Sequence, residues 1–232
     1  MTKAINCMLT ILALSLSQNS FSQKSIADTV FLLKESDDSN YHAIFIDTLK
    51  KSEYYTLISD FEFGQFDKDG YDYSLEYLRD KKIKLTKNKI SDIAKKWIVL
   101  KYYKKQFYNY CPSDFYTHFK VSITDTTFID YSGEGPSASK INTYKKLNEK
   151  TFLFSLTSIE KPKRNLIIHI IDKQNGIAIF EEHNMGKDKQ YYLMIDASKF
   201  RQLPIIVNYC VTQKQMEFNF DNPDFKQLLR MR

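Results

Sequence analysis

The sequence predicts a mainly β protein: an antiparallel meander that forms a barrel or a sandwich, with one or two short helices in the N-terminal third. Short segments rich in β-branched and aromatic residues recur about every 8 to 12 residues, with turn residues between them. Aromatic residues make up 15% of the chain, which favours half-buried pleated surfaces over helix bundles. A hydrophobic fraction of 43% with few Gly and Pro excludes collagen-like and disordered chains.

The first 22 residues have the features of a secretory signal peptide. Lys3 precedes an apolar run of ten residues, Cys7 to Leu16, and small residues follow up to Ser22. Such a run is too short for a membrane-spanning helix, which needs about 20 residues. We expect cleavage after Ser22 and export, so that the protein is secreted or periplasmic. Residues 23–232 are predicted to form a single β-rich domain, because no linker rich in Gly, Ser or Pro interrupts them.

The first strands are expected at residues 29–34 and 41–48, which are short, apolar and rich in β-branched or aromatic side chains. The pattern weakens from residue 50 to residue 90, where short helices fit as well as strands. Ser91 and Asp92 are suited to capping a short helix, because their side-chain oxygens accept hydrogen bonds from free amides.

Residues 97–110 fit two structures. A long helix from Ile90 would gather the apolar side chains on one side. A hairpin suits the β-branched and aromatic composition better and places the polar pair Lys104-Lys105 at its midpoint. We predict the hairpin.

The strands after Pro112 form a regular series. Asn175-Gly176 supplies the positive φ that the loop between the strands at 165–171 and 177–180 needs. The strand at 165–171 is apolar on both faces except at His169, so we expect it to be covered on both sides, with His169 buried and one ring nitrogen satisfied. The other strands are expected at 119–124, 127–131, 140–147, 152–158, 191–196, 205–211 and 216–220.

An exported aromatic-rich meander resembles lipocalin-like barrels in architecture, and those barrels hold apolar ligands. The Gly-x-Trp of that family near the first strand is missing here, because Trp97 lies in mid-chain and follows Lys96. The resemblance implies a barrel and no particular ligand.

Positive charge is concentrated in the basic segment 79–105, which holds eleven Lys and Arg residues against Asp80 and Asp92. Aromatic residues are interleaved with these bases, as in anion-binding surfaces. The partner would then be an anionic glycan, an anionic membrane surface or another exported protein, whereas export argues against nucleic acid. A solvated Lys-rich face is the alternative interpretation. The candidate binding residues are Lys95, Lys96, Trp97, Tyr102, Tyr103, Lys104 and Lys105.

Cys111 and Cys210 are the cysteines that remain after export, and they are candidates for a disulfide in an oxidising compartment. Two separately buried thiols are the alternative. A third interpretation makes Cys111 a nucleophile with His118 and Asp114 nearby in sequence.

Residues 65–76 resemble the calcium loop of EF-hand proteins, with Asp67, Asp69 and Gly70 at loop positions three, five and six. Gln65 replaces the carboxylate of position one and Asp72 replaces the aliphatic residue of position eight, so an Asp-Gly surface turn explains the segment better.

We predict no metal, cofactor or catalytic residue. The four histidines lack metal-binding spacing, and Glu181-Glu182-His183 is interpreted as a polar loop.

Two functions remain open. The first is a non-enzymatic exported binding or interaction module, whose contact site is an aromatic-rich β surface or the basic segment. The alternative is an exported hydrolase-type enzyme with a site built from dispersed Asp, Glu and His. A cavity with two carboxylates, or His118 beside Asp114 and Cys111, would favour the enzyme. A barrel mouth or groove lined by Tyr and Phe without perturbed titratable groups would favour binding.

Overall fold

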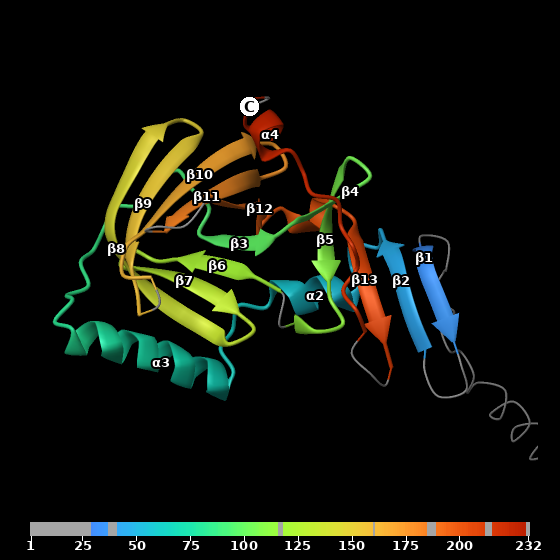
Figure 1. Ribbon diagram of the computed structural model, residues 1–232, viewed down its shortest axis with the longest axis horizontal. Coiled ribbons are helices and arrows are strands. Elements are labelled where there is room, and N and C mark those ends of the chain that lie inside the picture. The colour runs from blue at the N-terminus through green and yellow to red at the C-terminus, as the bar shows by residue number, and fades with distance from the viewer. Residues whose placement is uncertain are drawn as a thin grey trace, which may run out of the picture.

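Two β-sheets organise the chain, an eight-stranded closed barrel and a five-stranded sheet beside it (Figure 1). The computed structural model describes residues 29–36, 41–115, 118–159, 161–184, 189–211 and 215–230. The predicted signal peptide, residues 1–22, lies outside these ranges. No helix within them is long and apolar enough to cross a membrane.

The barrel confirms the predicted fold class, because every pair of neighbouring strands in it is antiparallel. Its strands follow the order β10-β11-β12-β3-β6-β7-β8-β9 around the barrel. Their bounds are β3 (Lys96–Val99), β6 (Lys120–Ile123), β7 (Thr127–Ser132), β8 (Gly135–Asn148), β9 (Thr151–Thr157), β10 (Arg164–Asp172), β11 (Ile177–Asn184) and β12 (Gln190–Asp196).

The five-stranded sheet has the order β1-β2-β13-β5-β4 and contains one parallel pair, β13 with β5. The chain leaves the barrel after β3 to form the β4–β5 hairpin, and it leaves again after β12 through the short helix η3 to form β13. The bounds are β1 (Thr29–Ser36), β2 (Tyr41–Asp47), β4 (Lys101–Tyr103), β5 (Gln106–Cys111), η3 (Phe200–Gln202) and β13 (Ile205–Cys210). The segment at 216–220, predicted as a strand, is not one.

Within the described ranges, three α-helices pack on these sheets: α2 (Glu53–Ser59), α3 (Gln65–Asp80) and α4 (Phe225–Arg230). In Figure 1, α2 lies at the junction of barrel and sheet, and α3 runs along the lower end of the barrel. Tyr55 and Ile58 of α2 are fully buried, and the Tyr55 hydroxyl donates a hydrogen bond to the carbonyl of Leu203 (2.7 Å). These contacts fix α2 between the two sheets.

Helix α3 corrects both interpretations of residues 65–76, since neither a calcium loop nor an Asp-Gly turn forms there. The Asp67 carboxylate accepts the backbone N–H of Gly64 at the start of the helix (3.1 Å), so it serves as a helix cap. The short helix expected after Ser91 is also absent, because residues 91–95 form bends without helical turns.

Large apolar side chains fill the core of the barrel. An eight-stranded barrel is either filled by side chains or holds one small ligand, as lipocalins do. Here the inward positions form one cluster of buried residues. The filling residues are Trp97, Val121, Ile123, Phe128, Ile141, Phe152, Phe154, Leu156, Leu166, Ile168, Ala178, Phe180 and Met194.

The hairpin predicted within residues 97–110 is confirmed, but it begins at Lys101, because β3 with Trp97 belongs to the barrel. Lys104 and Lys105 form its two-residue turn with φ values of 48° and 64°. Positive φ at both central positions is the geometry that suits the twist of a tight hairpin, and it is strained for a residue with a Cβ.

Replacing Lys105 with glycine is expected to stabilise the protein by about 1 kcal/mol, because glycine adopts this left-handed backbone without strain. Urea unfolding should show the change as a higher midpoint with an unchanged slope. Lys105→Ala is the matched control, since it removes the same charge and keeps the Cβ. If Lys105→Gly and Lys105→Ala were equally stable, the backbone at Lys105 would not be strained.

The candidate disulfide does not form: Cys111 and Cys210 are both free thiols, the first buried and the second half-buried. Cys111 lies opposite Val207 in the parallel pair of β5 and β13. Cys210 is three residues beyond Val207 on β13, which displaces it by about 10 Å along the strand at about 3.3 Å per residue. An offset of three also turns the two side chains to opposite faces of the sheet. A disulfide requires Cα atoms about 4.4 to 6.8 Å apart.

Cys111 is not suited to nucleophilic chemistry either. Its thiol is buried in the apolar core between barrel and sheet, and this burial raises its pKa to about 12. The thiol therefore stays protonated at physiological pH, whereas a nucleophilic cysteine needs its thiolate.

Candidate functional site

A hollow of about 420 Å³ opens at the end of the barrel that α3 covers. Chain segments that meet at this end supply its walls: the β7–β8 turn, the β9–β10 connection, the last residues of β11 and the face of α3 around Gly70 and Ser74. We call this hollow the barrel mouth. Its volume lies within the range of small-molecule sites, about 300 to 1,000 Å³.

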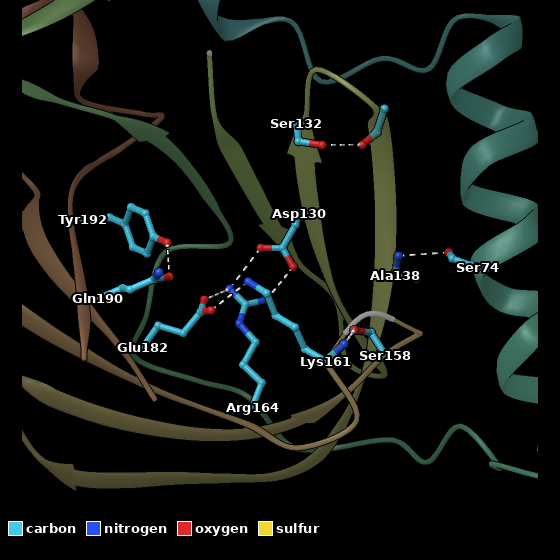
Figure 2. Close-up of polar contacts among 11 residues, drawn as sticks. Ser74, Asp130, Ser132, Ala138, Ser158, Lys161, Arg164, Glu182, Gln190 and Tyr192 are labelled. Atoms are coloured by element: carbon cyan, nitrogen blue, oxygen red, sulfur yellow. Dashed lines mark hydrogen bonds and ion pairs between the residues drawn. The ribbon is translucent and has the colours of Figure 1, made fainter. Parts of the chain in front are cut away.

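Four ionised side chains form the floor of the barrel mouth. The buried Arg164 guanidinium donates to both carboxylate oxygens of Asp130 (2.5 and 3.1 Å) and to Glu182 (2.6 Å). The Lys161 ammonium donates to the second oxygen of Glu182 (2.7 Å). Figure 2 shows the guanidinium between the two carboxylates, with Lys161 beside them. The network therefore holds these four side chains in place.

Strand alternation places these charges directly above the apolar core. On β10, Arg164 and Leu166 face inward, and on β7 Phe128 and Asp130 do the same. The guanidinium lies over the Phe128 ring, 5.1 Å from its centroid. Burial by itself would lower the pKa of Arg164, but Asp130 and Glu182 hold it above its ordinary value.

The walls of the barrel mouth combine hydroxyl groups with aromatic rings. Phe119 and Tyr192 form an adjacent pair with ring centroids 5.8 Å apart, and Tyr73 of α3 stands opposite the sheet as a largely exposed side chain. Burial raises the pKa of Tyr192, so its hydroxyl is neutral, and it donates to the Gln190 side chain (2.8 Å). The serine hydroxyls of the lining belong to Ser74, Ser132, Ser137 and Ser158.

A hydrogen bond of Ser74 helps to fasten α3 over this end of the barrel. Ser74 accepts the backbone N–H of Ala138 (2.9 Å) and donates to the carbonyl of Tyr71 (2.6 Å). The pairing of β8 with β9 starts only at Lys140, so β9 offers no hydrogen-bond partner to the backbone N–H of Ala138. The Ser74 hydroxyl of α3 accepts this N–H instead.

A smaller hollow of about 120 Å³ shares Ser132, Gly135 and Pro136 with the barrel mouth. His118 lines it and is 6% exposed, and no described residue hydrogen-bonds its Nε2. Burial, with the nearby charges of Lys120 and Lys101, lowers the pKa of His118 to about 3. The imidazole is therefore neutral at physiological pH.

His118 is expected to make the protein less stable as the pH falls from 7 to 5. The unfolded chain takes up a proton near pH 6.5, whereas the folded protein does so only near pH 3, so protons favour unfolding within this window. The free energy of unfolding should fall by up to about 1.4 kcal/mol for each pH unit.

Urea unfolding at several pH values measures this slope, and the slope should be smaller in His118→Gln. An equal slope in His118→Gln would contradict this assignment, while His183→Gln serves as the control on the outer face.

The outer face of the barrel carries a second polar cluster around Glu181. Its carboxylate accepts hydrogen bonds from His169 (2.9 Å), His183 (2.7 Å) and Lys189 (2.8 Å). Burial would raise the pKa of Glu181, but these three partners lower it to about 2. The predicted burial of His169 with one satisfied nitrogen is confirmed. Within the described ranges, no group of His, Cys, Asp and Glu is arranged to hold a metal ion.

The seven residues predicted to bind a ligand are not gathered at one place. Trp97 is 1% exposed in the barrel core and donates from its indole N–H to the carbonyl of Ala94 (2.9 Å). Lys95 and Lys96 line a separate open hollow on the outer surface. The other four residues, Tyr102, Tyr103, Lys104 and Lys105, belong to the β4–β5 hairpin of the second sheet.

The basic segment 79–105 is equally dispersed. Figure 1 shows the chain after α3 rising along the side of the barrel away from the five-stranded sheet, whereas β4 lies in that sheet. Several of its lysines also have partners within the protein: Lys96 lies over the Phe61 ring (5.0 Å) and Lys101 over the Phe220 ring (5.6 Å). The segment therefore does not form one basic surface.

The sequence reasoning missed the barrel-mouth residues, and its interpretation of Glu181-Glu182-His183 as a loop is wrong. These residues complete β11, where Glu182 points into the barrel and Glu181 points out. One signal was present in the sequence: a hairpin centred on residues 173–176 pairs residues equally far from the turn. The length of β10 therefore requires a β11 that continues to residue 184.

No protein-family model, no curated protein and no solved structure matches this chain. The function is therefore inferred from the geometry of the site.

Proposed function

We propose that this protein is an exported, non-enzymatic binding module that holds a small polar ligand in the barrel mouth. The observation that carries the proposal is a hollow of about 420 Å³ whose charged floor is fixed by its own ion pairs. Groups held in place before binding lose little conformational entropy when a ligand arrives, which favours recognition.

The two contact surfaces expected from the sequence support binding less well than the barrel mouth does. The basic segment is spread over both sheets. On the five-stranded sheet, Tyr103 and Tyr110 pack against Phe218 and Phe220 of the C-terminal segment, with ring centroids 5.0 and 4.8 Å apart. These aromatic side chains therefore already have partners in the protein's own chain.

Ligand binding in the barrel mouth is tested with Ser137→Leu, which adds bulk to the lining of the hollow and keeps its four ion-paired residues, although residue 137 lies opposite Asp130 in the β7–β8 pairing. Small polar molecules that raise the melting temperature of the wild-type protein should leave this variant unchanged. Thr143→Leu, an exposed position further along β8, is the matched control and should respond like the wild type. Binding at this place would be contradicted if no molecule of the library raised the melting temperature of the wild type. It would also be contradicted if Ser137→Leu and Thr143→Leu responded equally.

A hydrolase is the second candidate, because Asp130 and Glu182 bring two carboxylates to one hollow. Hydrolysis by a carboxylate pair needs one member to carry a proton. Here both carboxylates accept hydrogen bonds from Arg164, which makes them acceptors in an ion network. Turnover of p-nitrophenyl esters or glycosides that disappears in Glu182→Gln would support the hydrolase and contradict a purely binding role.

Export is tested on the protein recovered from outside the cytoplasm. Removal of residues 1–22 should leave Gln23 as the first residue, because small residues precede the expected cleavage position. Intact-mass measurement checks this, and a mass that still includes Met1 would contradict the signal peptide.

A further inference from the structure

We infer that the ligand of the barrel mouth is a neutral polyhydroxylated molecule, of the chemical class of a single sugar unit. This inference rests on the proposed function and names its ligand class. It follows from the balance of charge on the floor, from the kind of hydrogen bond that the floor offers and from the apolar part of the walls.

The four charges on the floor cancel, and the exposed Glu134 of the β7–β8 turn is the one further charged residue among the described residues of the lining. Arg164 and Lys161 carry two positive charges, and Asp130 and Glu182 carry two negative ones, each within hydrogen-bond distance of an opposite charge. On this floor, a ligand with a net charge would lose part of its hydration without meeting an uncompensated opposite charge. A neutral ligand avoids this cost.

The floor offers acceptors and donors side by side. An ionised carboxylate has about four lone-pair positions, and Arg164 uses two of those of Asp130. The Lys161 ammonium has three N–H groups and gives one to Glu182. A hydroxyl group donates to the carboxylates and accepts from the ammonium, whereas a ligand's ammonium group only donates and its carboxylate group only accepts. A serine hydroxyl has the same double capacity, but the hydroxyl protons of Ser74 and Ser132 are already donated to the carbonyls of Tyr71 and Gly135. The serines of the walls with this capacity are therefore Ser137 and Ser158.

The aromatic part of the walls requires an apolar surface on the ligand as well. Phe119 and Tyr192 form an adjacent pair of rings, and Tyr73 lines the same hollow from α3. A sugar ring has hydroxyl groups around its edge and C–H groups on its faces, so it matches both kinds of wall. The hollow of about 420 Å³ equals roughly fourteen water molecules at about 30 Å³ each, which leaves room for one ring with bridging waters.

Calorimetric titration of the full mature chain tests this ligand class. The neutral probes are glucose, galactose and N-acetylglucosamine, and the charged probes are glucuronate and glucosamine. At least one neutral sugar should bind at least tenfold more tightly than both charged relatives. Ser137→Leu should abolish the binding, and Thr143→Leu should keep it.

The other outcomes separate this inference from the proposed function. If no neutral sugar binds but glucuronate, glucosamine or an amino acid binds in a way that Ser137→Leu abolishes, the binding site stands and the neutral polyol class is wrong. Binding of a neutral sugar that persists in Ser137→Leu would place it elsewhere and overturn the inference. If none of these probes and no small polar molecule binds the wild type, both proposals fail.

Discussion

Replacing Arg164 with methionine is expected to lower the free energy of unfolding by about 3 to 5 kcal/mol, because it leaves Glu182 and Asp130 without their shared cation. The Glu182 side chain is 1% exposed, so little water reaches it to replace the lost hydrogen bonds. Urea unfolding measures the change through the midpoint at an unchanged slope.

Lys161→Met is the matched control for this experiment. Lys161 also pairs with Glu182, but its side chain is 35% exposed, so its loss is expected to cost about 1 kcal/mol or less. The double variant Arg164→Met with Glu182→Gln should recover part of the stability, since it removes both members of a buried pair. An Arg164→Met protein within 1 kcal/mol of the wild type would contradict the role of the network.

Replacing Trp97 with alanine is expected to cost about 3 to 5 kcal/mol, the range for truncation of a large buried aromatic side chain. The indole is 1% exposed, lies 5.3 Å from the Phe180 ring between centroids and hydrogen-bonds to Ala94. A ligand-stacking side chain at the surface would cost far less. The comparison therefore distinguishes the observed core position from the predicted binding role.

The Trp97 experiment has an independent readout. The chain contains one Trp, so its fluorescence reports on this position alone. The native protein should resist quenching by acrylamide, and urea should remove this protection in the same transition that circular dichroism shows. Trp97→Phe keeps an aromatic ring and should be less damaging than Trp97→Ala. Rapid quenching in the native protein would contradict the buried indole.

Much of the β architecture could be read from local patterns. The strands at 152–158, 165–171 and 191–196 agree with β9, β10 and β12 to within one residue at each end. Their alternation of side chains and their turn residues depend on neighbours along the chain, which the sequence displays directly. Gly176 at the β10–β11 turn has the positive φ expected there (71°).

Helix α3 shows where local patterns fail. Gly70 and the aspartates around it suggest a turn, yet the segment is helical, held by the contact of Ser74 with Ala138 and by the buried Leu78. The first contact joins residues 64 positions apart in the sequence. Tertiary packing therefore outweighs the weak local propensity.

The division between the two sheets is also a tertiary property. Trp97 and Tyr102 lie five positions apart in similar aromatic surroundings, but one fills the barrel and the other lies in the hairpin of the second sheet. Cys111 and Cys210 lie on neighbouring strands, and their relation depends on the register of the parallel pair. Register is set by the packing of whole sheets and by turn geometry.

The mainly β class, the positions of most strands and the tight turns thus follow from the sequence, because alternation and turn chemistry are local. The barrel mouth does not. Asp130, Lys161, Arg164 and Glu182 come from different strands and loops, and they meet because closure of the barrel brings β7 close to β10 and β11. A polar residue in a strand pattern looks the same in the sequence whether it faces water or a buried ion pair, and only the closed sheet decides between the two.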